Sequence, residues 1–342
     1  MKIEHLKNKI KTVFRPIYYL LWQLINIIRR KPKAQGYIFM LHRVAEWNMS
    51  GLYWNEHMKV SPQKLDNILK KMKQKYDFIR LEDVPQRLNS KGKFKKKFVV
   101  FTMDDGYKDN LTIALPIFKK YNVPYTIFLV SDFMDKKALL WWYVLEDLLL
   151  TNNEIKLSNG IVYPAKTMDE KCRSFLDIRA EILKLDQEYL DQGLNDLFKE
   201  YHVDWYVHNE ELCLDWNDIN ILKNEALVTL GAHTKHHFNL KELDTRERVK
   251  QEVLDGCKRI HEQAGFVPKV FAYPFGSANE VGSREYNVLA ELGETLSVAT
   301  IGYGGPVLGS DSCNLYSLPR IMLKEDSSFV TLLKEAKKVR LI

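Results

Sequence analysis

Two adjacent aspartates, Asp104 and Asp105, end an apolar run and are followed at once by Gly106. Neighbouring carboxylates in such a place are costly to keep ionised, because burial and mutual repulsion both disfavour the charged form. A bound cation or a shared proton would relieve that cost. A pair of this kind in isolation is more often a turn or a helix N-cap, so a metal site needs further ligands elsewhere in the chain.

Those ligands follow a second apolar run, residues 227–230, which leads into His233, His236 and His237. One carboxylate and two imidazoles form the three-ligand set of a catalytic zinc, which leaves a fourth position for water. A metal lowers the pKa of its water from 15.7 toward about 7, so a second carboxylate nearby could accept the proton near neutral pH. If the two strand ends meet, the residues predict a metal-dependent hydrolase.

Three segments resemble, in order, the motifs of the polysaccharide deacetylases, the NodB-like domain of carbohydrate esterase family 4. Residues 101–106 (FTMDDG) resemble the first motif, and residues 233–237 (HTKHH) match the second, H-[ST]-x-x-H, with one additional histidine. Residues 271–276 (FAYPFG) resemble the third motif, which ends in P-x-G. The combination is specific, whereas D-D-G or H-x-x-x-H alone would be weak.

The resemblance implies a role for each matching residue. Asp104 would be the catalytic base, while Asp105, His233 and His237 would hold a divalent metal, with zinc as the expected ion. The backbone N–H of Phe275 would stabilise the oxyanion. The remaining positions that we expect to support the site are Lys269, Pro274, Gly276 and Tyr107.

Two departures from the family pattern concern the base and the acid. Where the family has an arginine that orients the base, this chain has Lys269, which supplies charge but no bidentate fork. A C-terminal L-x-H motif is replaced by residues 318–320 (LPR). Residues 37–44 (YIFMLHRV), however, resemble the segment that opens one branch of the family, which includes poly-N-acetylglucosamine deacetylases and uses an N-terminal histidine as acid. His42 is therefore the candidate acid, because an imidazole pKa of about 6.5 suits protonation of a departing amine.

From residue 36 onward the chain alternates strand-like and helical patterns. Seven or eight β-α units predict a parallel sheet, and we expect a deformed (β/α)7-8 barrel of the NodB type. The candidate residues follow strand ends, where such barrels carry their chemistry. Helices are expected to begin at Ser61 and Thr245. The expected strands lie near residues 37–41, 77–81, 98–103, 125–130, 227–232, 269–273, 295–301 and 315–322.

A long segment, about residues 139–224, separates the fourth and fifth expected strands. We interpret it as a largely helical insertion within the catalytic domain, residues 36–342, because it exceeds what one crossover needs. It leaves the catalytic rim and could cover the cleft. For Trp141 and Trp142, core packing is the favoured role, and stacking on a sugar ring is the alternative. His236 is expected to turn away from the metal.

The N-terminal residues 1–35 combine a 13-residue aromatic and aliphatic run, residues 16–28, with basic residues on both sides. The run is shorter than the roughly 20 residues that span a bilayer, and no small-residue cleavage site follows it. Two interpretations stay equal. The helix lies on an anionic membrane through residues 1–33, on the inner face near lipid-linked glycans, or it packs on the barrel as an amphipathic helix.

Composition fits a globular enzyme of one main domain, with 342 residues, 46% of them hydrophobic. The net charge of +7 comes without a basic-aromatic motif, so we expect no nucleic-acid partner. Four cysteines without C-x-x-C spacing indicate reduced thiols and a cytoplasmic protein.

The predicted function is removal of acetyl from an N-acetylated sugar of a polysaccharide or lipid-linked glycan. Two alternatives stay open. The chain could be a carbohydrate-binding relative with impaired catalysis, which acetate release would exclude. It could also be an O-acetyl esterase or a non-sugar amidase on the same fold, which comparison of esters with amides would separate.

Overall fold

The computed structural model describes residues 34–90, 94–309 and 313–326. The helix expected over residues 16–28, and the membrane contact expected of residues 1–33, lie outside the described residues. Within the described part, the helices are too short or too polar to cross a bilayer.

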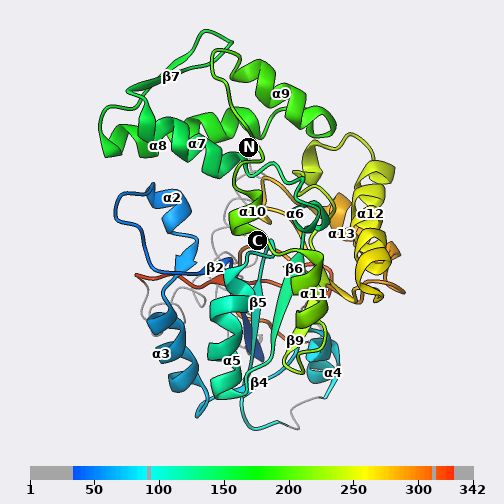
Figure 1. Ribbon diagram of the computed structural model, residues 1–342. Coiled ribbons are helices and arrows are strands. Elements are labelled where there is room, and N and C mark those ends of the chain that lie inside the picture. Colours follow the sequence, from blue (N-terminus) through cyan, green and yellow to red (C-terminus); the bar gives the residue numbers. More distant parts are fainter. Residues whose placement is uncertain (1–33, 91–93, 310–312, 327–342) are drawn as a thin grey trace, which may run out of the picture. The chain divides into compact units, whose positions relative to one another are not determined.

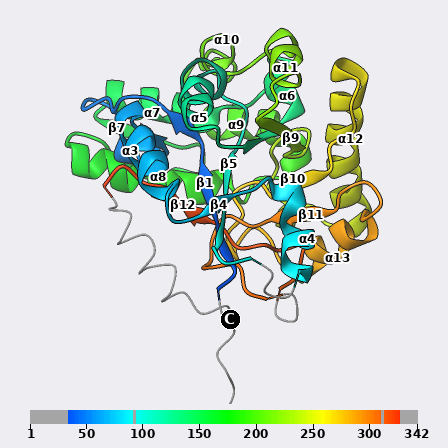
Figure 2. The same ribbon diagram turned by 90° about the horizontal axis from the view of Figure 1, so that it is seen from below.

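A single parallel sheet forms the centre of the described chain (Figures 1 and 2). Its strand order is β11-β10-β9-β6-β5-β1-β12, and β4 pairs with β5 off this path. Each expected strand is present, which confirms the alternating pattern. The strands are β1 (Gly36–Leu41), β4 (Asp77–Phe78), β5 (Phe98–Met103), β6 (Tyr125–Leu129), β9 (Val228–Ala232), β10 (Val270–Ala272), β11 (Val298–Thr300) and β12 (Ile321–Met322).

The central strands are buried on both faces. All residues of β1 and β5 are buried, and the two strands pair in register from Gly36 opposite Phe98 to Leu41 opposite Met103. Continuous apolar runs are typical of parallel strands that are covered by helices on both sides. The register sets the carboxyl ends of β1 and β5 side by side.

The C-terminal segment joins the two ends of the sheet. Strand β12 pairs with β1, whereas Leu318, just before β12, donates its N–H to the carbonyl of Ala299 in β11 (2.9 Å). The carbonyl of Leu318 also accepts from Ile301 (3.0 Å). The sheet is therefore curled into a deformed barrel, as predicted.

Two helices begin where the sequence predicted. Ser61 caps α3 (Pro62–Met72) by accepting from the N–H of Lys64, and Thr245 caps α12 (Arg246–Ala264) by accepting from the N–H of Arg248. Such caps satisfy backbone donors that a first turn leaves unpaired. The other helices that accompany the sheet are α4 (Val84–Asn89), α5 (Leu115–Tyr121), α11 (Trp216–Leu222) and α13 (Ser283–Glu291).

Between β6 and β9 the chain forms mostly helices, as predicted, together with a hairpin that was not predicted. Several of these elements gather at the top of Figure 1, away from α3, α4 and α5. Besides α11, the helices of this segment are α6 (Ser131–Met134), α7 (Trp141–Thr151), α8 (Met168–Ile182), α9 (Leu190–Leu197) and α10 (Asn209–Leu212). The hairpin pairs β7 (Glu154–Lys156) with β8 (Val162–Pro164).

All four cysteines, Cys172, Cys213, Cys257 and Cys313, are unpaired. This agrees with the predicted reduced thiols.

Candidate metal and catalytic site

The predicted residues converge at the carboxyl ends of the strands. His42 follows β1, Asp104 and Asp105 follow β5, His233 follows β9, and Phe275 follows the end of β10. Parallel strands present their carboxyl ends at one edge, so residues far apart in sequence meet there. A cavity of about 400 Å³ opens between them, and the predicted residues that line it are His42, Asp104, Asp105, Tyr107, Trp141, Trp142, His233, His237 and Phe275.

Asp105, His233 and His237 form a possible metal site. The Oδ1 atom of Asp105 lies 3.4 Å from Nε2 of each histidine. The three ligand atoms lie within 4.8 Å of one another. Tetrahedral zinc bonds of about 2.0–2.1 Å imply ligand atoms roughly 3.3–3.4 Å apart. The spacing therefore fits a small divalent ion.

The hydrogen bonds around these ligands also fit a cation. Nδ1 of His233 lies 2.7 Å from the carbonyl oxygen of Ala272. A carbonyl only accepts, so Nδ1 carries the hydrogen and Nε2 turns a lone pair toward Asp105. The Oδ1 atom of Asp105 is buried without a hydrogen-bond donor. Two electron-pair donors in buried contact are stabilised when a cation or a proton lies between them.

His237 is neutral at neutral pH. Burial lowers the pKa of His237 to about 3, although Asp105 opposes that shift. Metals bind the neutral form of histidine. His237 therefore needs to lose no proton to become a ligand.

The site holds several residues in the left-handed backbone region. Asp105 (φ 77°), Thr234 (φ 70°), His237 (φ 65°) and Phe275 (φ 57°) have positive φ without being glycine. Such conformations cost about 1–3 kcal/mol each and persist where surrounding structure enforces them. Their concentration at one cavity indicates side chains held in place before any ligand arrives.

Asp104 is held by Arg320. Nη1 of Arg320 donates to Oδ1 (2.6 Å) and Nη2 donates to Oδ2 (2.7 Å), and both side chains are buried. Burial by itself would raise the pKa of Asp104, but Arg320, together with His233, holds it below the ordinary value. Asp104 is therefore ionised near neutral pH, as a base must be.

The structure corrects the prediction for Lys269. This residue is exposed and precedes β10, and it lines a different surface cavity together with Arg80 and Lys223. The length of β10 separates it from the carboxyl edge where Asp104 lies. The base is instead oriented by Arg320, from the LPR segment that replaces the family's C-terminal histidine motif.

His42 is fixed through its backbone. Nδ2 of Asn110 donates to the carbonyl of His42 (2.9 Å), and Oδ1 of Asp109 accepts from the N–H of Val44 (3.1 Å). Nδ1 of the His42 ring is buried without a protein partner. Burial lowers the pKa of His42, although Asp105 and Asp104 oppose the shift. Once protonated, such an imidazole would be a stronger acid than an exposed one.

The turn after β10 depends on close backbone packing. Gly276 has φ 67°, and a Cβ there would lie 2.4 Å from the backbone nitrogen of Gly302. The carbonyl of Pro274 accepts from the N–H of Gly276. The ring of Phe275 meets the ring of His237 at 4.7 Å in a T-shaped contact. Pro274 and Gly276 thus support the position of Phe275 beside the possible metal ligands.

The predicted aromatic residues differ in their surroundings. Trp142 is partly exposed, and its ring lies 5.6 Å from that of His237. Trp141 and Tyr107 are only 3% exposed, and Arg43 lies 5.2 Å from the Tyr107 ring. Trp142 is therefore the better placed of the two tryptophans for a sugar, and core packing accounts for Trp141.

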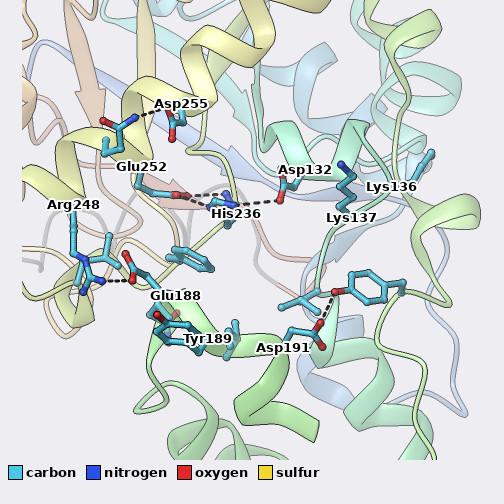
Figure 3. Close-up of a pocket in the computed structure, with 17 residues that line it drawn as sticks. Asp132, Lys136, Lys137, Glu188, Tyr189, Asp191, His236, Arg248, Glu252 and Asp255 are labelled. Carbon is cyan, nitrogen blue, oxygen red and sulfur yellow. Dashed lines mark hydrogen bonds and ion pairs between the residues drawn. The ribbon is translucent and has the colours of Figure 1, made fainter.

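His236 points into a second, larger cavity of about 770 Å³ (Figure 3). Its Nδ1 lies 2.6 Å from Oε2 of Glu252 on α12, and Nε2 lies 3.6 Å from Asp132. Oε1 of Glu252 also accepts from the N–H groups of Lys235 and His236. Glu252 thus ties the loop that carries His237 to α12.

The charged groups of this second cavity are largely paired with one another. Arg248 contacts Glu188, and the hydroxyl of Tyr206 donates to Asp191 (3.0 Å). Figure 3 shows the contact of Arg248 with Glu188, and Asp191 further along the cavity. Of the predicted site histidines, His42, His233 and His237 line the smaller cavity and not this one, so size alone does not make it the catalytic centre.

Sequence reasoning missed several residues that shape the first cavity. No local pattern indicated Arg320 as the buried partner of Asp104. Asp109 and Asn110 follow the first motif closely, so their contact with the His42 segment could have been anticipated once β1 and β5 were paired. Arg179 and Trp54 also line the cavity, and no local pattern indicated them.

Comparison with known proteins agrees with the predicted fold and family resemblance. Residues 91–170 match the polysaccharide deacetylase family. The chain is similar in fold to the Streptococcus pyogenes deacetylase PplD, whose structure was solved in complex with acetate. The two chains are 18% identical, and the match covers 90% of this chain and 99% of that chain with a TM-score of 0.57. It is also similar in fold to IcaB from Ammonifex degensii, to which it is 14% identical. That match covers 90% of this chain and 97% of that chain, with a TM-score of 0.55.

A Drosophila melanogaster protein with the name "Putative neutral sphingomyelinase" is 25% identical over 166 residues, which are 48% of this chain and 37% of that protein. The chain thus spans well under half the length of this relative. The family match over residues 91–170, the shared fold and the convergence of the three motifs agree with the predicted resemblance to the NodB-like polysaccharide deacetylases.

Proposed function

We propose that this protein uses a divalent metal to remove the acetyl group from an N-acetylated sugar of a polysaccharide or a lipid-linked glycan. The observation that carries the proposal is the buried contact of Asp105 with His233 and His237, with ionised Asp104 beside it. When bound there, a divalent ion would polarise the acetamide carbonyl and acidify a water.

The protein's own residues would carry out the proton transfers. Asp104, fixed by Arg320, would accept a proton from the attacking water. The backbone N–H of Phe275 would donate to the oxygen on which negative charge develops. His42 would protonate the departing amine, which leaves acetate and a free amino sugar as products.

The contact between Arg320 and Asp104 favours an enzyme over a binding relative that has lost catalysis. The third motif lacks the expected arginine, and Arg320, which directly precedes β12, orients the base instead. A protein that only bound sugar would have no need for a buried, bidentate pair on the base. Such pairs give geometric specificity that a lysine cannot.

Acetate release from N-acetylglucosamine oligomers by protein reconstituted with zinc tests the proposal. We expect Asp104→Asn to retain the metal and lose about 10²–10⁴-fold in rate, and His233→Ala to lose both metal and activity. Lys269→Ala is the matched control, because that side chain is exposed and remote. Full turnover by Asp104→Asn would refute the assignment of the base.

The alternative substrates call for a separate comparison. An O-acetylated sugar ester and the matching N-acetyl sugar should be presented to the same preparation. Faster cleavage of the ester, without measurable amide cleavage, would favour an esterase on this fold. Acetate from the amide at a comparable or higher rate would support the de-N-acetylase.

A further inference from the structure

Helix α8 brings one arginine into the candidate catalytic cavity. Phe175, Leu176 and Arg179 all line that cavity, and their spacing sets them on one face of the helix. The wall around them is apolar and aromatic, with Trp54 and Trp142 nearby in the same lining. Arg179 has no part in the chemistry proposed above.

The guanidinium of Arg179 lacks a hydrogen-bond acceptor within the described residues. Its nearest carboxylate oxygen, Oε1 of Glu280, is 3.9 Å away, which exceeds hydrogen-bond distance. The other oxygen of Glu280 accepts from Ser277. The remaining contact is with the ring of Phe275, 5.7 Å from Cζ to the centroid. Five N–H donors are therefore available to a ligand.

This arginine differs from the others that the structure describes, each of which donates at least one hydrogen bond to the protein. Arg320 and Arg43 bind carboxylates, and Arg284 binds backbone carbonyls. The side chain of Arg179 is 34% exposed. Burial lowers the pKa of Arg179, although Glu280 opposes the shift. The guanidinium is thus partly withdrawn from water while the protein supplies no hydrogen bond in return, and an anionic ligand would offset that cost.

The contacts also place the guanidinium close to the reaction. Arg179 lies against the ring of Phe275, and that ring meets His237 at 4.7 Å. One side chain therefore separates the guanidinium from a possible metal ligand. A group bound by Arg179 would belong to the same sugar, or to the linkage beside it.

We propose that Arg179 binds an anionic group, a phosphate or a carboxylate, on the N-acetyl sugar that this enzyme deacetylates. This inference rests on the proposed function and narrows its substrate class. A guanidinium offers two parallel donors that match either anion. The aromatic wall would pack against the apolar face of the same ring.

Calorimetry with zinc-loaded Asp104→Asn protein, which should retain the metal and turn over very little sugar, tests binding separately from catalysis. Three sugars of similar size are compared: N-acetylglucosamine, N-acetylglucosamine 1-phosphate and N-acetylmuramic acid. We expect one of the two anionic sugars to bind roughly ten- to hundredfold more tightly than the neutral one. Comparing the affinities of the phosphate-bearing sugar and the carboxylate-bearing sugar shows which of the two anionic groups Arg179 binds. The preference should weaken as salt is added.

Because the metal can also attract an anion, variants of Arg179 are needed to distinguish its contribution to anion binding from that of the metal. Arg179→Gln should remove the preference, and Arg179→Lys should retain part of it. Arg173→Gln is the matched control, since Arg173 lies exposed on the same helix and donates to the carbonyl of Asp169. Equal affinity for neutral and anionic sugars, or an unchanged preference in Arg179→Gln, would overturn the proposal.

Acetate release from the same sugars distinguishes the two proposals. If neutral sugar is deacetylated and anionic sugars bind no more tightly, the proposed deacetylase activity is supported and the proposed role of Arg179 is refuted. Anion binding that depends on Arg179, without acetate from any N-acetyl sugar, would support the anion site and refute the deacetylase.

Discussion

The buried pair of Arg320 and Asp104 allows a sharp prediction about stability and catalysis together. Arg320 makes four hydrogen bonds, two to Asp104 (2.6 and 2.7 Å), one to Oγ1 of Thr102 (3.1 Å) and one to the carbonyl of Ile301 (2.9 Å). Replacing it by methionine would leave the Asp104 carboxylate buried without a partner. Breaking a buried pair in this way costs about 3–5 kcal/mol, out of the roughly 5–15 kcal/mol that stabilises a typical domain.

The loss of stability caused by Arg320→Met should depend on pH in a defined direction. In the native protein the pKa of Asp104 is below its ordinary value, so its stabilisation is present above that ordinary value and is lost as pH falls through the lowered pKa. Without Arg320, burial would raise the pKa instead, and ionisation would then oppose folding. The stability difference between native protein and Arg320→Met should therefore grow as pH rises above about 4.

Urea unfolding between pH 3.5 and 7.5 measures this difference, and acetate release measures its catalytic consequence. Because Asp104 would become protonated at neutral pH, the acid limb of the rate profile should move to higher pH. The double variant Asp104→Asn with Arg320→Met should recover part of the stability, since no charge is left unpaired. Arg320→Lys should fold, but its rate of acetate release should be lower, because lysine cannot make the bidentate contact with Asp104.

A loss below about 1 kcal/mol in Arg320→Met at pH 7, with an unchanged rate profile, would refute this reasoning. The double variant keeps the test decisive if the single variant does not fold. Failure of the double variant to recover any stability would show that Arg320 acts through its other hydrogen bonds, to Thr102 and Ile301.

Three further predictions concern the metal loop, the third motif and the candidate acid. Glu252→Ala should weaken zinc affinity about tenfold, measured by competition with a chelator, because Glu252 accepts from the backbone N–H groups of Lys235 and His236 just before His237. Unchanged affinity would contradict the anchoring role. Gly276→Ala should lower the free energy of unfolding by a few kcal/mol in urea titration, since φ is 67° and Cβ would meet the Gly302 nitrogen; native stability would show that the turn can relax. Asn110→Ala should reduce kcat about tenfold without changing zinc affinity, because it frees the carbonyl of His42 (2.9 Å); an unaltered kcat would argue against His42 as acid.

The local sequence determined the strands and the polar residues at their ends. Apolar runs before Asp104 and before His233 predicted buried parallel strands, and the structure has β5 and β9 there. Carboxyl ends of parallel strands lie at one edge whatever the order of the strands within the sheet. For that reason the sequence alone predicts that the carboxylates and imidazoles meet. Likewise, Ser61 and Thr245 marked helix starts, because capping is a local interaction.

The partners of those residues were decided by tertiary structure alone. Arg320 reaches Asp104 because β12 pairs with β1, which is itself in register with β5; nothing local encodes a contact across 216 positions of the chain. Lys269 was misjudged for the same reason, since sequence distance to a motif does not tell which end of a strand a side chain occupies. Arg179 enters the cavity only because α8 folds over it. Short-range patterns fix secondary structure, whereas the packing of distant elements fixes which charges face each other.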